Sequence, residues 1–427
     1  MRKYMLIMGG WMWVMPGHAM DMYSALQTVY ETNPVIGEMR ASVRGASADL
    51  GLAKSQMLPY VGAAAGTGFA RTKVGHDTFG YEPTQIGIEA QQNLFQGFSI
   101  LAGVKAARSK LAAARAALYA TQQDVFLNAI NAYINVLNAR HVLELNQNNK
   151  RVLDQYYDLV HARADVGALT NTDVAQASAR VEMARYSVAD AQGAYNNALE
   201  TFRRIYGDVL DKYSEIDMTK MAHLFPESAA QAEEFAIANH PTIAALDAQR
   251  DAAAAGVIGA YKTILPSVDV RASVMQVEDI PILDHARDSR VGVYLKLPLF
   301  DRGMAVANVE RARSQTSGID EKIIHARRVI VENLYSAWNI YDAQTTAISA
   351  AETSVAANQL ALDGTREEQR RGRRTVLDVL NAHQELLNAQ VSLTRARHAK
   401  ISAFFAILAA IGKLNPDNLG INDIADQ

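Results

Sequence analysis

The chain has 427 residues, of which 20% are charged, and its formal net charge is −3. This near-neutral balance excludes the basic surface on which nucleic-acid binding depends. The sequence contains no cysteine, which excludes disulfide bonds, thiolate metal sites and lipid attachment at an N-terminal cysteine. Its histidines form no pair with the spacing of a zinc site, and it has no nucleotide-binding or nucleophile–base motif. We therefore expect no catalytic residue, no bound metal and no cofactor.

Residues 1–19 have the layout of a cleaved secretory signal peptide. Arg2 and Lys3 precede a mostly apolar run at residues 4–15, which Pro16 ends, and small residues follow. The alternative is a retained anchor, but the run is shorter than the roughly 20 residues that a membrane-spanning helix needs. No later segment is apolar for long enough either. If the protein enters a membrane, we expect it to do so without helices.

Proline positions predict where long helices can form. The ten prolines leave residues 84–225 and 299–415 free of proline. Because a proline inside a helix costs about 3 kcal/mol, these two segments are the places where uninterrupted helices are expected.

The two proline-free segments belong to an internal duplication. Asn33-Pro34 recurs as His240-Pro241, at an offset of 207 residues. The other matched pairs lie at offsets of 207 or 205: Leu58-Pro59 with Leu265-Pro266, Leu94-Phe95 with Leu299-Phe300, Gly167 with Gly372, Asp173 with Asp378, and Gly207 with Gly412. A period this long indicates one structural unit used twice rather than a solenoid.

These matches predict the division of the chain into domains. After the signal peptide, residues 20–207 form the first repeat and residues 237–412 form the second. Residues 208–236 link the two repeats, and residues 413–427 form a C-terminal tail.

Four segments are predicted to be strands. Apolar and polar residues alternate at 84–94, 267–274 and 290–299, and a fourth strand is predicted at 61–74, which is rich in glycine and alanine. Alternation suits a soluble sandwich, and it equally suits a membrane barrel with lipid on one side and a wet lumen on the other. The export signal and the lack of a second sheet favour the barrel. So do aromatic residues near the strand ends, which are Tyr60, Phe69, Tyr81, Phe95, Phe98 and Phe300.

Four strands cannot close a barrel, because bacterial barrels begin at about eight strands. An open sheet edge is also excluded in lipid, where no water satisfies its backbone groups. The chain must therefore combine with copies of itself. Two copies would supply eight strands, and three would supply twelve.

Helices are predicted on both sides of the strands. Each repeat begins with a helix, at residues 35–57 or 242–264, and ends with a helix pair: 98–164 with 170–206 in the first repeat, and 303–371 with 375–411 in the second. At about 1.5 Å per residue, the longer helices reach about 100 Å. Apolar residues at alternating spacings of three and four predict coiled-coil packing. An ordinary helical bundle explains these seams equally well, but it does not explain the strands.

The same three residues recur at both predicted helix turns: Gly167, Thr170 and Asp173 in the first repeat, and Gly372, Thr375 and Asp378 in the second. The glycines are predicted to end the long helices. Thr-x-x-Asp is a capping arrangement for the start of a helix, and an aspartate there opposes the positive end of the helix dipole. Capping alone accounts for both aspartates.

In their order and spacing, these segments resemble the TolC-type outer-membrane efflux channels. The similar segments are Leu299-Phe300-Asp301-Arg302-Gly303 after the last strand, residues 166–174 at the first turn and residues 372–382 at the second. The resemblance covers nearly the whole mature chain, including the duplication.

The resemblance implies a mixed, mainly α-helical fold and a homotrimer. Three chains would form a twelve-stranded transmembrane β-barrel, continued into the periplasm by a tunnel of long antiparallel α-helices in coiled-coil packing. The linker at 208–236 and the tail at 413–427 would form an equatorial belt. The implied function is a passive outer-membrane channel of a tripartite export system, either an efflux pump or type I protein secretion.

The resemblance also implies partners besides outer-membrane lipid. An inner-membrane pump, of the ABC or the resistance-nodulation-division type, would act with a periplasmic adaptor, or membrane fusion protein, to open the channel. The adaptor would contact the two helix turns, at Gly167, Thr170, Asp173, Gly372 and Thr375.

A gate at the periplasmic end of the tunnel is implied as well. Asp378 would point into the narrow end and form an acidic ring in the trimer, and Arg374 would hold the closed state through polar contacts between helices. The sequence departs from the family at Asn381, where a second aspartate is expected, so the ring would be less acidic. It departs again at Gln369, where a tyrosine is expected.

The competing interpretation is a soluble coiled-coil structural protein of the periplasm that never enters the membrane. It predicts solubility without detergent and no conductance across a lipid bilayer.

Overall fold

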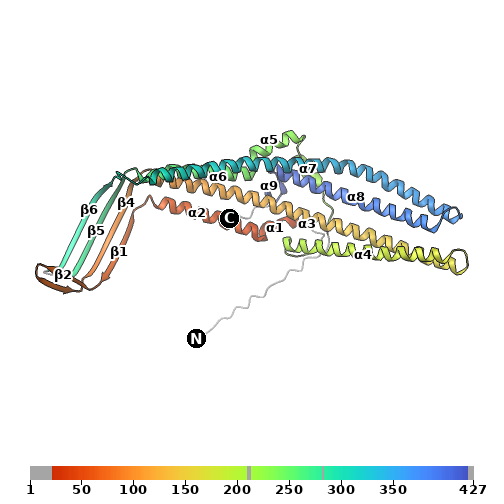
Figure 1. The fold of residues 1–427 in the computed structure, drawn as a ribbon, viewed down its shortest axis with the longest axis horizontal. Helices are drawn as coiled ribbons and strands as arrows, with labels where there is room; N and C mark the ends of the chain where they lie inside the picture. Colours follow the sequence, from red (N-terminus) through yellow and green to blue (C-terminus); the bar gives the residue numbers. More distant parts are fainter. Residues whose placement is uncertain (1–21, 209–212, 281–282, 422–427) are drawn as a thin grey trace, which may run out of the picture. The chain divides into compact units, whose positions relative to one another are not determined.

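A computed structural model describes residues 22–208, 213–280 and 283–421 of the chain. The predicted signal peptide at residues 1–19 lies outside the described residues, as do parts of the predicted linker and of the C-terminal tail. The described chain is mainly helical with a few strands, which confirms the predicted fold class (Figure 1).

The helices follow one another in the order that the duplication predicts. They are α1 (Met22–Thr32), α2 (Pro34–Ser55), α3 (Ser99–Asp165), α4 (Asn171–Tyr206), α5 (Ala229–Asn239), α6 (Pro241–Ala260), α7 (Met304–Arg370), α8 (Val376–Ala410) and α9 (Pro416–Leu419). Two short 3₁₀ helices, η1 (Met218–Leu224) and η2 (Tyr261–Thr263), precede α5 and follow α6.

The longest helices, α3 and α7, have 67 residues each. Neither helix contains a proline, which would remove a backbone hydrogen bond from the helix interior. Their predicted bounds differ from the observed ones by one residue at each end. The return helices α4 and α8 begin one residue later than predicted, because the threonine before each is the capping residue and not the first helical residue.

Prolines set the start of α2 and α6. Both helices begin at the proline itself, one residue earlier than predicted, because the missing N–H of proline is not needed in the first helical turn. The preceding helices α1 and α5 were not predicted. They lie 207 residues apart, so the duplication extends to them. The predicted boundary between residues 236 and 237 falls inside α5.

Four strands form one antiparallel sheet in the order β1-β4-β5-β6, with β1 at Tyr60–Thr67, β4 at Thr84–Gln96, β5 at Ser267–Ile280 and β6 at Leu283–Lys296. A separate hairpin pairs β2 (Ala70–Val74) with β3 (Asp77–Tyr81). The prediction of one strand over residues 61–74 is therefore wrong. Glycines at positions 66 and 68 flank the point where the chain leaves the larger sheet, and glycine offers no side chain to hold the strand in place.

Strands β5 and β6 are longer toward their connecting turn than the sequence pattern predicts. Between Val274 and Arg290 polar residues occupy both faces, so the alternation disappears from the sequence while the backbone pairing continues. At its other end β6 stops at Lys296 instead of residue 299, because Pro298 has no N–H to donate to a neighbouring strand.

The strand register assigns the side chains of the larger sheet to two faces. Ala90, Ala272 and Val291 lie opposite one another across three strands, and Glu89, Ser273 and Arg290 do the same one position along. Because successive side chains point to opposite faces, one face is apolar and the other is polar.

The chain divides into two compact units, and each takes segments from both repeats. One unit combines residues 35–121 and 237–331 and contains all the described strands. The other combines the chain up to residue 34 with 122–236 and 332–427, and it contains both helix turns. The largest fully buried side chains of this second unit include Tyr133, Phe126, Phe202 and Phe405.

Candidate functional site at the helix turns

Glycine closes both long helices in the same way. Gly167 and Gly372 adopt φ angles of 73° and 74°, in the left-handed region. The N–H of Gly372 donates to the carbonyl of Gln369 at 3.0 Å, and the N–H of Arg373 donates to the carbonyl of Glu368 at 2.8 Å. The equivalent two bonds close the first turn. This pair of bonds is the Schellman motif, which satisfies the last carbonyls of a helix.

Each return helix begins with a complete capping box. The Thr375 hydroxyl accepts the N–H of Asp378 at 3.2 Å, and the Asp378 carboxylate accepts the N–H and the hydroxyl of Thr375 at 2.9 and 2.8 Å. Thr170 and Asp173 repeat these contacts at 3.2, 3.0 and 2.8 Å. The predicted capping role of both aspartates is therefore confirmed.

The capping contacts also keep the Asp378 carboxylate charged. Hydrogen bonds from the backbone N–H and then the hydroxyl of Thr375 hold the pKa of Asp378 below its usual value, and Arg374 lowers it further. The carboxylate is therefore ionised at neutral pH. A charged acid next to a helix turn is able to attract cations.

Arg374 pairs across its own turn. Its Nε donates to Oε2 of Glu368 at 2.9 Å, and this bond is the main reason that the pKa of Arg374 is raised, with Asp378 adding to it. Among the described residues we find no partner for Arg374 on another helix pair. A contact of that kind would have to come from a neighbouring copy of the chain.

Asn381 joins the two repeats. Its Oδ1 accepts a hydrogen bond of 2.7 Å from Nη2 of Arg180, which links α8 to α4. The two residues are 201 positions apart, and no local pattern pairs them, so Arg180 was not predicted. The residue that makes the predicted ring less acidic is thus also the acceptor of an interhelical contact.

A second polar contact, also not predicted, joins α7 to α8. The guanidinium of Arg366 contacts Nε2 of His383, which is 9% exposed. Burial, and then the positive charge of Arg366, lower the pKa of His383 to about 4. His383 is therefore neutral near pH 7 and accepts the arginine hydrogen.

Two clusters of buried apolar side chains pack the helices together next to the turns. One cluster comes from α3, α4 and α8 and consists of Leu153, Val160, Ala177, Ala184, Val376 and Leu380. Another comes from α7 and α8 and consists of Leu362, Val379 and Leu386. Tyr156 packs against both clusters, and its buried hydroxyl has no hydrogen-bond partner in the described part of the chain. Both helix pairs are thus packed against each other at their turns.

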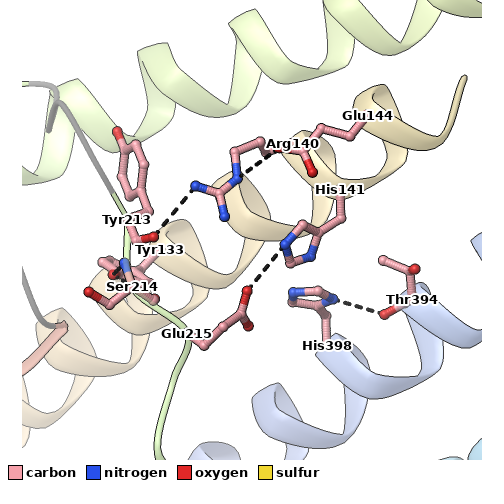
Figure 2. A network of polar contacts seen from close by, with 9 residues as sticks. All are labelled: Tyr133, Arg140, His141, Glu144, Tyr213, Ser214, Glu215, Thr394 and His398. Carbon is pink, nitrogen blue, oxygen red and sulfur yellow. Dashed lines mark hydrogen bonds and ion pairs between the residues drawn. The ribbon is translucent and has the colours of Figure 1, made fainter. Parts of the chain in front are cut away.

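A separate polar network ties part of the predicted linker to α3 (Figure 2). The Tyr133 hydroxyl donates to the carbonyl of Ser214 and accepts its N–H, both at 2.9 Å. Nε2 of His141 lies 3.2 Å from a carboxylate oxygen of Glu215. These contacts fix the chain after α4 against the middle of α3.

The same network reaches α8. The ring centroid of His398 lies 5.4 Å from that of His141, and Nδ1 of His398 lies 2.8 Å from the carbonyl of Thr394 (Figure 2). Burial is the main cause that lowers the pKa of His398. His141 thus lies between the predicted linker segment and α8, and it contacts both.

Among the described residues, no helix has the length and apolar character needed to cross a membrane. No group of three or more histidine, cysteine, aspartate or glutamate side chains there is arranged as a metal site would require.

Two long helix pairs with capped turns and a small antiparallel sheet give this chain the fold of solved outer-membrane channel proteins. The chain superposes on the outer membrane channel CmeC of Campylobacter jejuni with a TM-score of 0.83, over 95% of this chain and 90% of that one. The sequence identity is 16%, so this likeness shows the fold alone.

Sequence comparison then gives the family. The profile of the outer membrane efflux protein family matches residues 25–208 and 234–413. The chain is 30% identical over 400 residues to the outer membrane efflux protein BepC of Brucella suis, covering 93% of this chain and 86% of BepC. It is 25% identical to the outer membrane protein TolC of Escherichia coli, over 66% of this chain and 60% of TolC. The chain belongs to the outer membrane efflux protein family.

Membership of this family decides between the two functions that the sequence left open. The family consists of outer-membrane channels rather than enzymes, and the protein is a transport channel of the cell outer membrane. The soluble periplasmic alternative is not supported.

Proposed function

We propose that three copies of the chain form a passive export duct, with a twelve-stranded barrel in the outer membrane and a helical tunnel in the periplasm. One observation carries this proposal. The larger sheet has two open edges, at β1 and β6, and one of its faces is apolar. An open edge in lipid leaves backbone groups without partners, so β6 of one copy has to pair with β1 of the next.

Exposed side chains on the apolar face support the membrane location. Val291, Val293 and Leu295 of β6 are 83%, 69% and 70% exposed, and Ile86 and Ile88 of β4 are 62% and 60% exposed. Water disfavours an apolar surface of this extent on a single chain, whereas lipid does not. The polar face, which includes Glu89, Arg271 and Arg290, would then line a wet lumen.

The periplasmic end of the tunnel would be closed at rest by the helix pairs. In this arrangement three Asp378 carboxylates form an acidic ring at the aperture, and Asn381 adds no charge to it. Arg374 holds the closed state by contacts between copies. Opening is a shift between two helix arrangements, which a partner biases by binding one of them better.

The partners follow from the passive nature of the duct. A channel without a nucleotide site needs an inner-membrane pump, of the ABC or the resistance-nodulation-division type, to drive export. A periplasmic adaptor would engage the exposed turns at Gly167, Thr170, Asp173, Gly372 and Thr375. The exported substrate would be a small molecule or ion for an efflux pump, or a protein for type I secretion.

Planar-bilayer recordings test the duct and its aperture together. We expect small, cation-selective currents from the detergent-purified protein. Asp378→Asn keeps an oxygen that is able to cap the helix but removes the charge, so cation selectivity falls. Asp342→Asn removes the same charge from an exposed position on α7 away from the turns and leaves the selectivity unchanged.

The outcomes separate the two parts of the proposal. If the inserted protein conducts and Asp378→Asn has the selectivity of the unmodified protein, the aperture assignment is wrong but the duct stands. If the protein does not insert or conduct, the duct itself is wrong.

A further inference from the structure

The apolar face of the larger sheet ends abruptly toward the β5–β6 turn. On β6 this face carries Leu295, Val293 and Val291, and then Ser289, Arg287 and His285. On β5 it carries Val274 and then Gln276 and Glu278. Both strands of this face are polar where Gln276 lies opposite Arg287 and Glu278 opposite His285, and β6 changes one residue pair earlier, at Ser289 opposite Val274.

The position of this change agrees with the thickness of a membrane. From Leu295, the last apolar residue of this face within β6, to Arg287 the strand advances by eight residues, about 26 Å at about 3.3 Å per residue. A strand tilted by about 40° then rises about 20 Å, close to the height of about 25 Å of the apolar band of a membrane barrel. Arg287 therefore lies where the lipid headgroups begin. An arginine on the lipid side costs little at that depth and several kcal/mol at the bilayer centre.

The Arg287 guanidinium is free to take a ligand. It is exposed, and it makes no ion pair or hydrogen bond with another residue that the structure describes. Glu278 lies on the same face, but its carboxylate accepts a hydrogen bond of 3.1 Å from Gln276, which stands directly opposite Arg287. Arg290, by contrast, lies on the polar face and pairs with Asp288 at 2.7 Å.

A shallow groove leads from the apolar band to this arginine. It runs over β4, β5 and β6, and its lining includes Ile88, Val274, Val291, Ser289 and Arg287. Arg290 also lines the groove, but its guanidinium is already paired with Asp288. One end of the groove thus suits a hydrocarbon chain, and the other presents a cation that is able to bind a phosphate through two parallel N–H groups.

We propose that this groove binds a lipid with an anionic phosphate headgroup, with an acyl chain over Ile88, Val274 and Val291 and the phosphate on Arg287. The inference rests on the proposed membrane location of the sheet. The chain enters β5 from η2 and leaves β6 toward α7, so the β5–β6 turn lies at the end of the sheet away from η2 and the start of α7, which belong to the same compact unit. Because the helices are periplasmic in the proposed duct, the lipid belongs to the outer leaflet.

Native mass spectrometry of the detergent-purified oligomer tests the inference, with phosphatidylglycerol and phosphatidylcholine of equal chain length as probes. The phosphate of phosphatidylcholine is neutralised by its own choline group. We expect the unmodified protein to bind phosphatidylglycerol about tenfold more tightly, the value of one charge-assisted contact. Arg287→Gln abolishes the preference, and Arg287→Lys keeps part of it. Arg271→Gln, the same change on the polar face of β5 and outside the groove, retains it.

Two results would overturn the inference. One is an unmodified protein that binds both lipids equally, and the other is an Arg287→Gln protein that still prefers phosphatidylglycerol. Conductance of the same samples in planar bilayers is measured in parallel. A protein that conducts but does not select the lipid contradicts only the lipid site, whereas a protein that does not conduct contradicts the duct.

Discussion

One glycine at each turn determines how a long helix ends. Gly372 has a positive φ, and a Cβ added there meets no atom within 4 Å, so the effect of Gly372→Ala is purely conformational. We expect a loss of about 1–2 kcal/mol, the cost of a left-handed alanine. Gly364→Ala, inside α7 and equally uncrowded, provides the control and should stabilise by about 0.5–1 kcal/mol. The thermal unfolding midpoint of the purified protein should therefore fall in the first variant and rise in the second. A neutral Gly372→Ala would contradict this account of the turn.

His383 makes the stability of the helix pair depend on pH. Its pKa is about 4 in the folded chain because of burial and of Arg366, whereas an unfolded histidine has a pKa of about 6.5. As the pH falls from 6.5 toward 4, the unfolded chain takes up a proton that the folded chain does not, so stability is lost. The loss is at most about 1.4 kcal/mol for each pH unit in this window.

Replacing His383 by glutamine removes this contribution while keeping a hydrogen-bond acceptor for Arg366. We expect the unfolding midpoint of His383→Gln to fall less between pH 7.5 and pH 5 than that of the unmodified protein. Other titrating groups, including His240, are common to both proteins and cancel in the comparison. Equal decreases in the two proteins would show that His383 does not titrate in this way.

The residues at the turns differ in how far they could be predicted. Glycine, threonine and aspartate were found from local spacing, because a helix end is a contact among residues a few positions apart. Arg180, Arg366 and His383 were not found. Their partners lie on other helices, 201 positions away for Arg180 and 17 positions away across a turn for the other two. A sequence period does not show which faces of two helices will meet.

At the scale of elements, the contact between Arg180 and Asn381 tests whether α4 and α8 act as one body near the turns. Arg180→Ala and Asn381→Ala each remove the same hydrogen bond, so the double variant should lose less stability than the sum of the single variants. We expect a coupling of about 0.5–1 kcal/mol, because the pair is exposed. Chemical unfolding of the four proteins measures it. Strict additivity would mean that the bond contributes nothing to the packing of the two helices.

Helices were easier to predict than strands, for a physical reason. Prolines, turn glycines and capping threonines mark helix ends in the sequence, and the bounds of α3, α4, α7 and α8 were predicted to within one residue. The sequence analysis merged β2 with β1 and missed β3, because each strand of this hairpin has only five residues and carries too short a pattern to be separated from its neighbours. Strand β6 was predicted too short at its turn, where Arg287, Asp288 and Arg290 place charge on both faces.

At the scale of the whole molecule, the open edges of the sheet decide how many copies must assemble. The number of copies does not follow from one chain, because any closed ring satisfies β1 and β6 equally. Two copies would give eight strands and three would give twelve, and both numbers occur among membrane barrels. The number of copies in the closed ring therefore has to be measured.

Cysteine cross-linking between copies makes that measurement, since the chain has no cysteine of its own. Ala63 of β1 and Val291, Val293 or Leu295 of β6 share the apolar face. Within one chain two strands separate β1 from β6, a gap of about 14 Å, whereas a disulfide requires Cα atoms within about 7 Å. Any bond between these positions therefore joins two copies.

We expect Ala63→Cys combined with one of the three β6 cysteines to give covalent dimers and trimers, and nothing larger, on a non-reducing gel. Each single variant should instead give at most a dimer. A ladder that stops at the dimer in the double variant would indicate an eight-stranded ring of two copies. A ladder that continues beyond the trimer would indicate an open or larger assembly. The absence of cross-links at all three β6 positions would mean that β1 and β6 do not close the barrel.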